Sequence, residues 1–219
     1  MATDSNVTVQ QRVVIAADTV VRGHVVIKSG TVVHPHATLD ASRGPMVVGE
    51  NCIVEEHVHL VSPPQGMTVG DGNVFRIGCH VSAPDIGNCN VFEPASRIST
   101  SITNFCVVGA GCTADGPALP ERTVVYGAAS EHRTWSGEGI GQQLALHAKH
   151  LVYLRDQIPK SHKLRVIREL QSPCWGRAGA RPFPPGGTGR PTAQEAWAAA
   201  HLPLVAHRYA APLMRGQMP

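Results

Sequence analysis

The stretch Ile15-Ala-Ala-Asp-Thr-Val20 is followed directly by three hexads of the same pattern: Val21-Arg-Gly-His-Val-Val26, Ile27-Lys-Ser-Gly-Thr-Val32 and Val33-His-Pro-His-Ala-Thr38. An aliphatic residue opens each hexad, and a small or β-branched residue follows four places later. The pattern is interrupted and resumes as far as Gly127. A period of six fits neither an α-helix nor a coiled coil, and it is the signature of a parallel β-helix.

The hexads predict a triangular prism in which three hexads make one coil of about 18 residues. On this basis residues 13–127 form an all-β, single-stranded parallel β-helix domain of about six coils. Glycine or asparagine is expected at the corners to relieve backbone strain. These residues are Gly49, Gly70, Gly87 and Gly109 at the second place of a hexad, and Gly30, Asn51, Gly72 and Gly111 at the fourth.

The chain departs from the six-residue frame at several places. Ser42–Pro45 and Ser62–Gly66 have the composition of loops, and we expect both to project from coil edges. The frame is also irregular from Ile98 to Cys106.

The rest of the chain divides by composition. Residues 1–12 form a polar lead, residues 128–139 a linker, residues 140–170 a helical region, and residues 171–219 a tail rich in Pro, Gly and Ala that we expect to be disordered.

The helical region has one apolar face. Its residues recur at spacings of three and four, and they are Leu144, His147, Leu151, Leu154 and Ile158. We expect this helix to pack on the prism and to cover an open coil end, where strand edges are unpaired. Pro159 is expected to end or kink the helix. A second helical stretch with Leu164, Ile167 and Leu170 on one side is expected after it.

The composition excludes several classes. Of the 219 residues, 42% are hydrophobic but only 5% are aromatic, which favours a narrow core of aliphatic side chains. The net charge of +3 is too small to indicate nucleic-acid binding. The start of the chain lacks the regions of a secretory signal, and no apolar run is long enough to span a membrane. We therefore expect an intracellular protein without membrane insertion.

The cysteines support this expectation. Three of them, Cys52, Cys79 and Cys112, occupy the fifth place of a hexad, where a small side chain points inward. Cys89 lies at a turn, Cys106 in the irregular stretch and Cys174 in the tail. Because no Cys-x-x-Cys pair occurs, neither a disulfide framework nor a zinc knuckle is expected.

Two stretches, residues 48–61 and 69–82, resemble the zinc-binding segments of gamma-class carbonic anhydrases. The resemblance puts the three ligand positions on Val61, Ile77 and Ser82. Zinc in a catalytic site needs three protein ligands and a water, so the positions that this class would use are vacant.

Histidines lie near these positions. His57 and His59 are two residues apart, which puts both on one face of a strand, and His80 lies one coil further on. We considered a shifted zinc site of His57, His59 and His80 and rejected it in favour of surface or corner histidines. An acyltransferase would need a catalytic histidine and a long loop for the acyl donor, and neither stands out. The sequence therefore predicts no catalytic, cofactor-binding or metal-binding residue, and a gamma-class carbonic anhydrase-like or acyltransferase hexapeptide enzyme remains the alternative.

Several runs together resemble the dynactin subunit 6 family over about residues 13–168. They include Pro120-Glu-Arg-Thr-Val-Val-Tyr-Gly127, and the more specific ones are Arg43-Gly-Pro-Met-Val-Val-Gly-Glu-Asn51 with Val54-Glu-Glu56, and the helix with Leu151-Val-Tyr-Leu154. One departure is Arg22-Gly23-His24, where the family has Arg-Gly-Asp.

The resemblance implies a left-handed β-helix and a non-catalytic structural subunit without cofactors. It implies a place in the pointed-end complex of dynactin, paired with subunit 5 and beside the actin-related subunit. The role that goes with it is support of dynein-dependent microtubule transport and cargo attachment, in the cytoplasm and on the cytoskeleton. The sequence does not identify the partner-facing residues.

Overall fold

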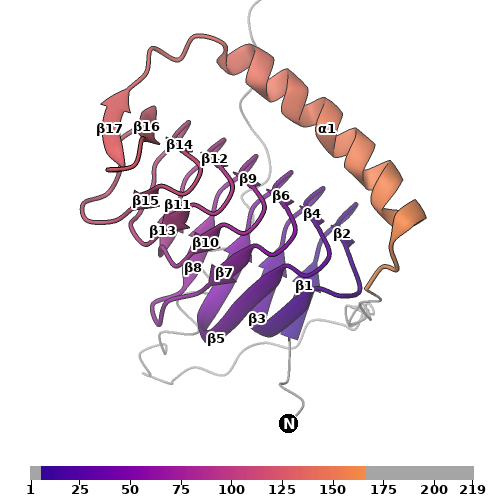
Figure 1. The fold of residues 1–219 in the computed structure, drawn as a ribbon. Coiled ribbons are helices and arrows are strands. Elements are labelled where there is room, and N and C mark those ends of the chain that lie inside the picture. The colour runs from indigo at the N-terminus through magenta and orange to yellow at the C-terminus, as the bar shows by residue number, and fades with distance from the viewer. Residues whose placement is uncertain (1–5, 166–219) are drawn as a thin grey trace, which may run out of the picture. The chain divides into compact units, whose positions relative to one another are not determined.

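The computed structural model describes residues 6–165, and every strand in that range belongs to one of two sheets (Figure 1). One sheet has eight strands: β2 (Val14–Ile15), β4 (Val32–Val33), β6 (Ile53–Val54), β9 (Val74–Phe75), β12 (Val91–Phe92), β14 (Val107–Val108), β16 (Thr123–Tyr126) and β17 (Glu131–Thr134). The other has nine: β1 (Asn6–Val9), β3 (Val20–Ile27), β5 (Thr38–Val48), β7 (His59–Val61), β8 (Met67–Val69), β10 (His80–Val81), β11 (Asp85–Ile86), β13 (Arg97–Ile98) and β15 (Thr113–Ala114). The expectations for the tail, for Cys174 and for Ile167 and Leu170 lie outside the described residues.

The sheets form the faces of a prism. In the nine-stranded sheet, Thr38–Asp40 of β5 pair with β7 and Met46–Val48 pair with β8, so this sheet bends round a corner and supplies two faces. The eight-stranded sheet supplies the third face, and all its strands except β17 are parallel. The predicted all-β class and the parallel β-helix are confirmed.

The described prism has one coil more than the estimate of about six. Every strand of the eight-stranded sheet except β17 belongs to a separate coil, which makes seven coils. The later coils are shorter than the earlier ones: the chain advances 21 residues from Val32 to its partner Ile53, but 16 residues from Val91 to its partner Val107. The irregular stretch is one of these short coils, in which Ile102 bridges Ile86 on one side and Leu119 on the other.

Alternate residues of each strand point into the prism. The inward residues are mostly Val, Ile, Leu, Met and Ala, and the two largest are Phe75 and Phe92, which stack with ring centroids 4.9 Å apart. Four cysteines are buried in this interior: Cys52, Cys79, Cys106 and Cys112. The sequence had placed Cys106 in an irregular stretch, but it occupies the same inward position as the others.

The corner glycines have two different roles. At the fourth place of the hexad, Gly30 and Asn51 have left-handed φ angles of 73° and 52°, as expected from the strain argument. At the second place the expected reason is wrong, because Gly49 has no positive φ. A Cβ on Gly49 would lie 2.2 Å from the carbonyl oxygen of Gly70, so these glycines allow close approach of successive coils.

The two insertions do not project separately. Residues 42–45 lie within β5. In the pairing of β5 with β3, these four residues face the single residue His24. The second insertion packs on the first, because the Ser62 hydroxyl donates a hydrogen bond to the Pro45 carbonyl (3.0 Å). The two insertions therefore thicken one corner of the prism.

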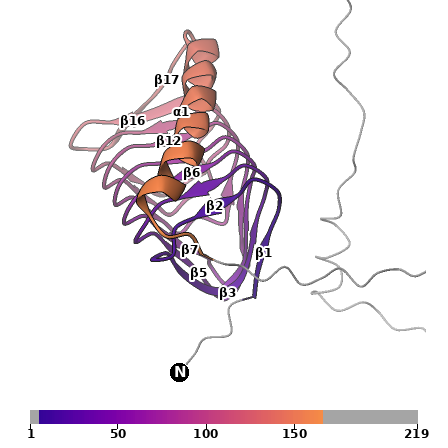
Figure 2. The same cartoon turned by 90° about the vertical axis from the view of Figure 1, so that its right-hand side faces the viewer.

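The helix α1 (Ile140–Ser161) lies along the eight-stranded sheet (Figure 2). Its buried side chains Leu151, Leu154 and Ile158 pack on outward-facing aliphatic residues of that sheet, Val32, Ile53 and Val74. It covers a face, and the expectation that it covers an open coil end is wrong. Pro159 lies within its last turn, and the helix ends at Ser161. Among residues 6–165, no helix combines the length and apolar character of a membrane span.

Other segments pair with the two edges of the eight-stranded sheet. β17, which falls in the expected linker, pairs antiparallel with β16. At the opposite edge Leu164 forms an antiparallel bridge with Ala16, and the amide of Arg165 donates to the carbonyl of Ile15 (2.8 Å). Leu164 is therefore in an edge bridge, where a second helix was expected. Unpaired edges favour aggregation; here β17 covers the edge of β16, and residues 163–165 pair with part of the edge beside β2.

Candidate functional site

The three candidate zinc histidines do not come together. His57 sits at a corner with a φ of 57°, and its ring stacks on His36 at a centroid distance of 5.3 Å. His59 is in β7, so the expectation that His57 shares its strand face is wrong. His59 lies opposite His80 of β10, with ring centroids 6.1 Å apart. Within residues 6–165, no group of three or more His, Cys, Asp or Glu side chains could hold a metal ion.

The vacant ligand positions lie in the same region. Val61 ends β7 and Ile77 is 51% exposed at a corner, and neither side chain has a donor atom for zinc. The Ser82 hydroxyl donates to the carbonyl of Ile98 (3.4 Å). Val61 and Ile77 therefore supply no zinc ligand, and the Ser82 hydroxyl is hydrogen-bonded within the prism.

The buried thiols are not poised as nucleophiles. Burial raises the pKa of Cys52 and of Cys79 to about 12, so both are protonated at neutral pH. Cys89 is the partly exposed thiol of the described residues, and burial followed by the charge of Asp71 raises its pKa as well.

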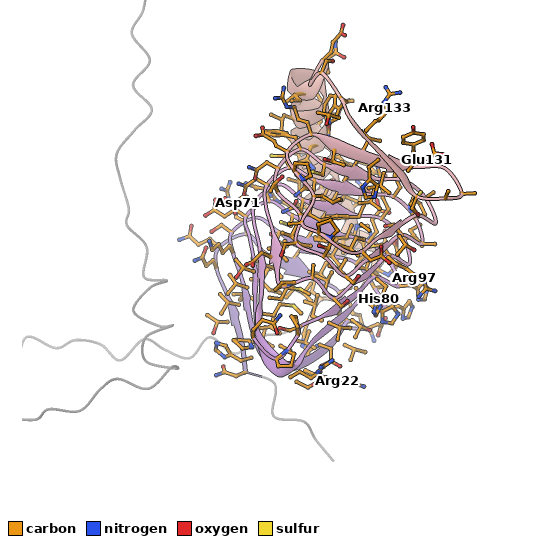
Figure 3. All side chains as sticks on the ribbon, turned by 90° about the vertical axis from the view of Figure 1, so that its left-hand side faces the viewer. Arg22, Asp71, His80, Arg97, Glu131 and Arg133 are labelled. Atoms are coloured by element: carbon orange, nitrogen blue, oxygen red, sulfur yellow. The ribbon has the colours of Figure 1, made fainter. Side chains whose placement is uncertain are left out.

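A row of polar side chains crosses one open face of the nine-stranded sheet. His59, His80 and Arg97 occupy equivalent outward positions on β7, β10 and β13. Burial, followed by the nearby charges of His59 and Arg97, lowers the pKa of His80. Figure 3 shows His80 and Arg97 close together on one side of the prism. Arg22 of β3 lies below them in this view. Arg22 pairs with Asp40 at 3.4 Å. α1 packs on the other sheet, so no helix of the described residues covers this surface.

Sequence reasoning missed a second polar row, which lies beside α1. Glu55 is buried, and it accepts hydrogen bonds from the Arg76 guanidinium (3.0 Å) and from the Ile77 amide (3.1 Å). Its neighbour Glu56 pairs with Nδ1 of His34 at 2.8 Å. Burial alone would raise the pKa of Glu56, but hydrogen bonds from His34 and its own amide outweigh burial and lower it.

Comparisons with known proteins agree with this geometry. No family model matches the chain. It is 30% identical over 184 residues to dynactin subunit 6 of Xenopus tropicalis, covering 77% of this chain and 89% of the relative. It is 33% identical over 176 residues to dynactin subunit 6 of Dictyostelium discoideum, covering 77% and 93%. This chain belongs to the dynactin subunit 6 family.

Solved structures with a similar fold are more distant. LpxA from Acinetobacter baumannii is 17% identical, with a TM-score of 0.44 over 73% of this chain and 88% of that one. A hexapeptide transferase family protein from Anaplasma phagocytophilum is 15% identical, with a TM-score of 0.46 over 68% and 92%. Similarity at this level carries no conclusion about activity.

Membership in the dynactin subunit 6 family confirms the resemblance found in the sequence. The structure also gives a physical role to its Val54-Glu55-Glu56 run, because each carboxylate joins its coil to a neighbouring one. These contacts join neighbouring coils, so the Val54–Glu56 run has a structural role in the prism.

Proposed function

We propose that this chain is a non-catalytic structural subunit of a dynactin complex, located at the pointed end in the cytoplasm and on the cytoskeleton. Its partners in this proposal are the related β-helix of subunit 5, side by side, and the actin-related subunit. In that position it supports dynein-dependent microtubule transport and cargo attachment. The observation that carries the proposal is the family match over most of both chains.

The arrangement of side chains supports a structural role. The positions that a gamma-class enzyme would use for zinc hold Val61, Ile77 and Ser82, and His57 is separated from His59 and His80. The faces of the nine-stranded sheet are rigid and flat, and one face of this kind can bury about 800 Å² per partner.

The test is affinity purification of the full-length tagged chain from cells of its own organism, followed by mass spectrometry. We expect subunit 5 and the pointed-end actin-related subunit to be recovered. Recovery of no dynactin subunit would overturn the proposal, and so would stoichiometric zinc in the purified protein.

A pair of charge reversals tests the side-by-side arrangement. Arg97→Glu changes the open sheet face, whereas Arg133→Glu changes the exposed strand β17 at the coil end. We expect Arg97→Glu to reduce recovery of subunit 5 and Arg133→Glu to leave it unchanged. The opposite result would mean that the coils meet end to end.

A further inference from the structure

The two halves of α1 relate differently to the sheet beneath them. The second half buries Leu151, Leu154 and Ile158. The first half, from Ile140 to His150, buries no side chain. Between this first half and strands β9 and β12 lies a groove of about 520 Å³.

The groove combines an apolar floor with a polar rim. Val74 and Val91 point outward from the sheet and Leu144 faces them from the helix, while Arg76, His147 and His150 supply polar groups. The apolar row continues beyond the groove, because Val107 and Val124 occupy the equivalent outward positions and are half-buried. An apolar occupant would therefore bury aliphatic surface that the helix leaves uncovered.

The charge of the lining has one sign. No carboxylate lines the groove, and its permanent charge is the guanidinium of Arg76, one amino group of which is paired with Glu55 outside the lining. The first turn of α1 carries no acidic side chain, and Gly139 caps it without a side-chain hydrogen bond. A helix N-terminus has a partial positive charge, so both ends of the rim favour a carboxylate.

Arg76 also has hydrogen-bonding capacity left. Its Nη1 donates to Glu55, but its buried Nε–H has no partner among the described residues. A buried donor without an acceptor costs free energy, and a shift of the Arg76 side chain toward an acceptor in the groove would reduce that cost.

We propose that this groove binds a peptide segment of another protein in which an aliphatic side chain adjoins a carboxylate. The aliphatic side chain packs on Val74, Val91 and Leu144, and the carboxylate faces Arg76 and the start of α1. This inference stands on the groove alone and does not rest on the proposed function.

Cys89 provides the readout, because it lines the groove and is partly exposed. The full-length protein is alkylated with iodoacetamide at about pH 8.5, where a larger share of this thiol is ionised, and the rate at each cysteine is mapped by mass spectrometry. The probe is acetyl-Ala-Leu-Glu-Leu-Ala-amide at about 1 mM, a concentration suited to a weak site. Its matched controls replace Glu by Lys, or both Leu by Ala.

We expect the Glu-containing peptide to slow alkylation of Cys89 at least about fivefold, and each control peptide to slow it less than about twofold. Leu144→Glu, which adds a carboxylate at the groove, should abolish the protection. Val152→Glu is the control variant, because Val152 is exposed on the same helix and does not line the groove. Circular dichroism should give equal helix content for the two variants.

Several outcomes would overturn the proposal. These are equal protection by the Lys peptide, or protection that survives in Leu144→Glu. Protection that appears without peptide and grows with protein concentration would identify a second copy as the occupant. Alkylation of Cys89 as slow as that of buried Cys52, at the lowest protein concentration and without peptide, would identify a segment of the chain itself.

Discussion

Two faces of this prism share one inward pattern and differ in what they present outward. On the eight-stranded sheet the outward residues form an aliphatic row: Val14, Val32, Ile53, Val74, Val91, Val107 and Val124. On the open face the equivalent row is Val20, Thr38, His59, His80, Arg97 and Thr113. The inward residues build the same core beneath both faces. The outward residues determine that α1 packs on the eight-stranded sheet and not on the open face.

The two rows also differ in whether they contribute to the stability of the fold. The aliphatic row does, because its members pack on Leu151, Leu154 and Ile158 of α1. On the open face His59 and Arg97 are exposed, and no helix of the described residues packs on them. The predictions below exchange features between the two faces, in order of decreasing effect.

Ile53→Asp should have the largest effect, because Ile53 is fully buried between the sheet and α1. An unpaired carboxylate there should lower the free energy of unfolding by at least about 4 kcal/mol. The matched change on the open face of the same coil is His59→Asp, where we expect less than about 0.5 kcal/mol. Urea denaturation of both variants checks this, and equal losses would refute the difference between the faces.

Leu154→Ala removes one of the three buried contacts of α1 and should cost about 2–5 kcal/mol. Val152→Ala, on the exposed side of the same helix, should cost less than about 0.5 kcal/mol. Thermal denaturation followed by circular dichroism gives both values. A small cost for Leu154→Ala would mean that α1 contributes little to the stability of the prism.

Glu55→Ala should cost about 1–3 kcal/mol, since it leaves the Ile77 amide and the Arg76 guanidinium without their acceptor. Arg76 is partly exposed, which limits the effect. The control is Asp40→Ala on the open face, whose pair with the exposed Arg22 should contribute less than about 1 kcal/mol. If the two changes cost the same by chemical denaturation, the row beside α1 has no special structural role.

The smallest effect should come from pH. Burial lowers the pKa of His147, whose Nε2 lies 2.7 Å from the carbonyl oxygen of Asn51. A lowered pKa means that the unfolded chain binds the proton more readily, so this stability is present above the unfolded pKa of about 6.5 and is lost as pH falls through the folded value. Tm should therefore fall between about pH 7.5 and 5.5. His147→Gln should flatten this dependence, and an unchanged slope would contradict the assignment.

Much of the fold could be predicted because a period of six is a local property. The period identified the prism, the inward positions of Cys52, Cys79 and Cys112, and the left-handed corners at Gly30 and Asn51. The spacing of Leu151, Leu154 and Ile158 identified the buried stripe of the helix.

The site could be predicted less well, because its contacts depend on register between coils. Glu55 meets Arg76 across 21 residues and His34 meets Glu56 across 22, and the insertions set these separations. The position of α1 could have been inferred from the aliphatic row, since Val32, Ile53 and Val74 each precede an inward residue on the same face. Leu164 gave no such signal, because a single edge bridge needs no periodic pattern.

The bridge between Ala16 and Leu164 bears on the order in which the protein is made. A repeat array ordinarily depends on contacts between neighbouring repeats alone, and domains begin to fold during synthesis. Here the edge of the first coil is completed by residues 163–165, which are translated after all seven coils. During synthesis the prism therefore has an unpaired edge beside β2. That edge is paired only after α1 has been made and the chain has returned to the first coil.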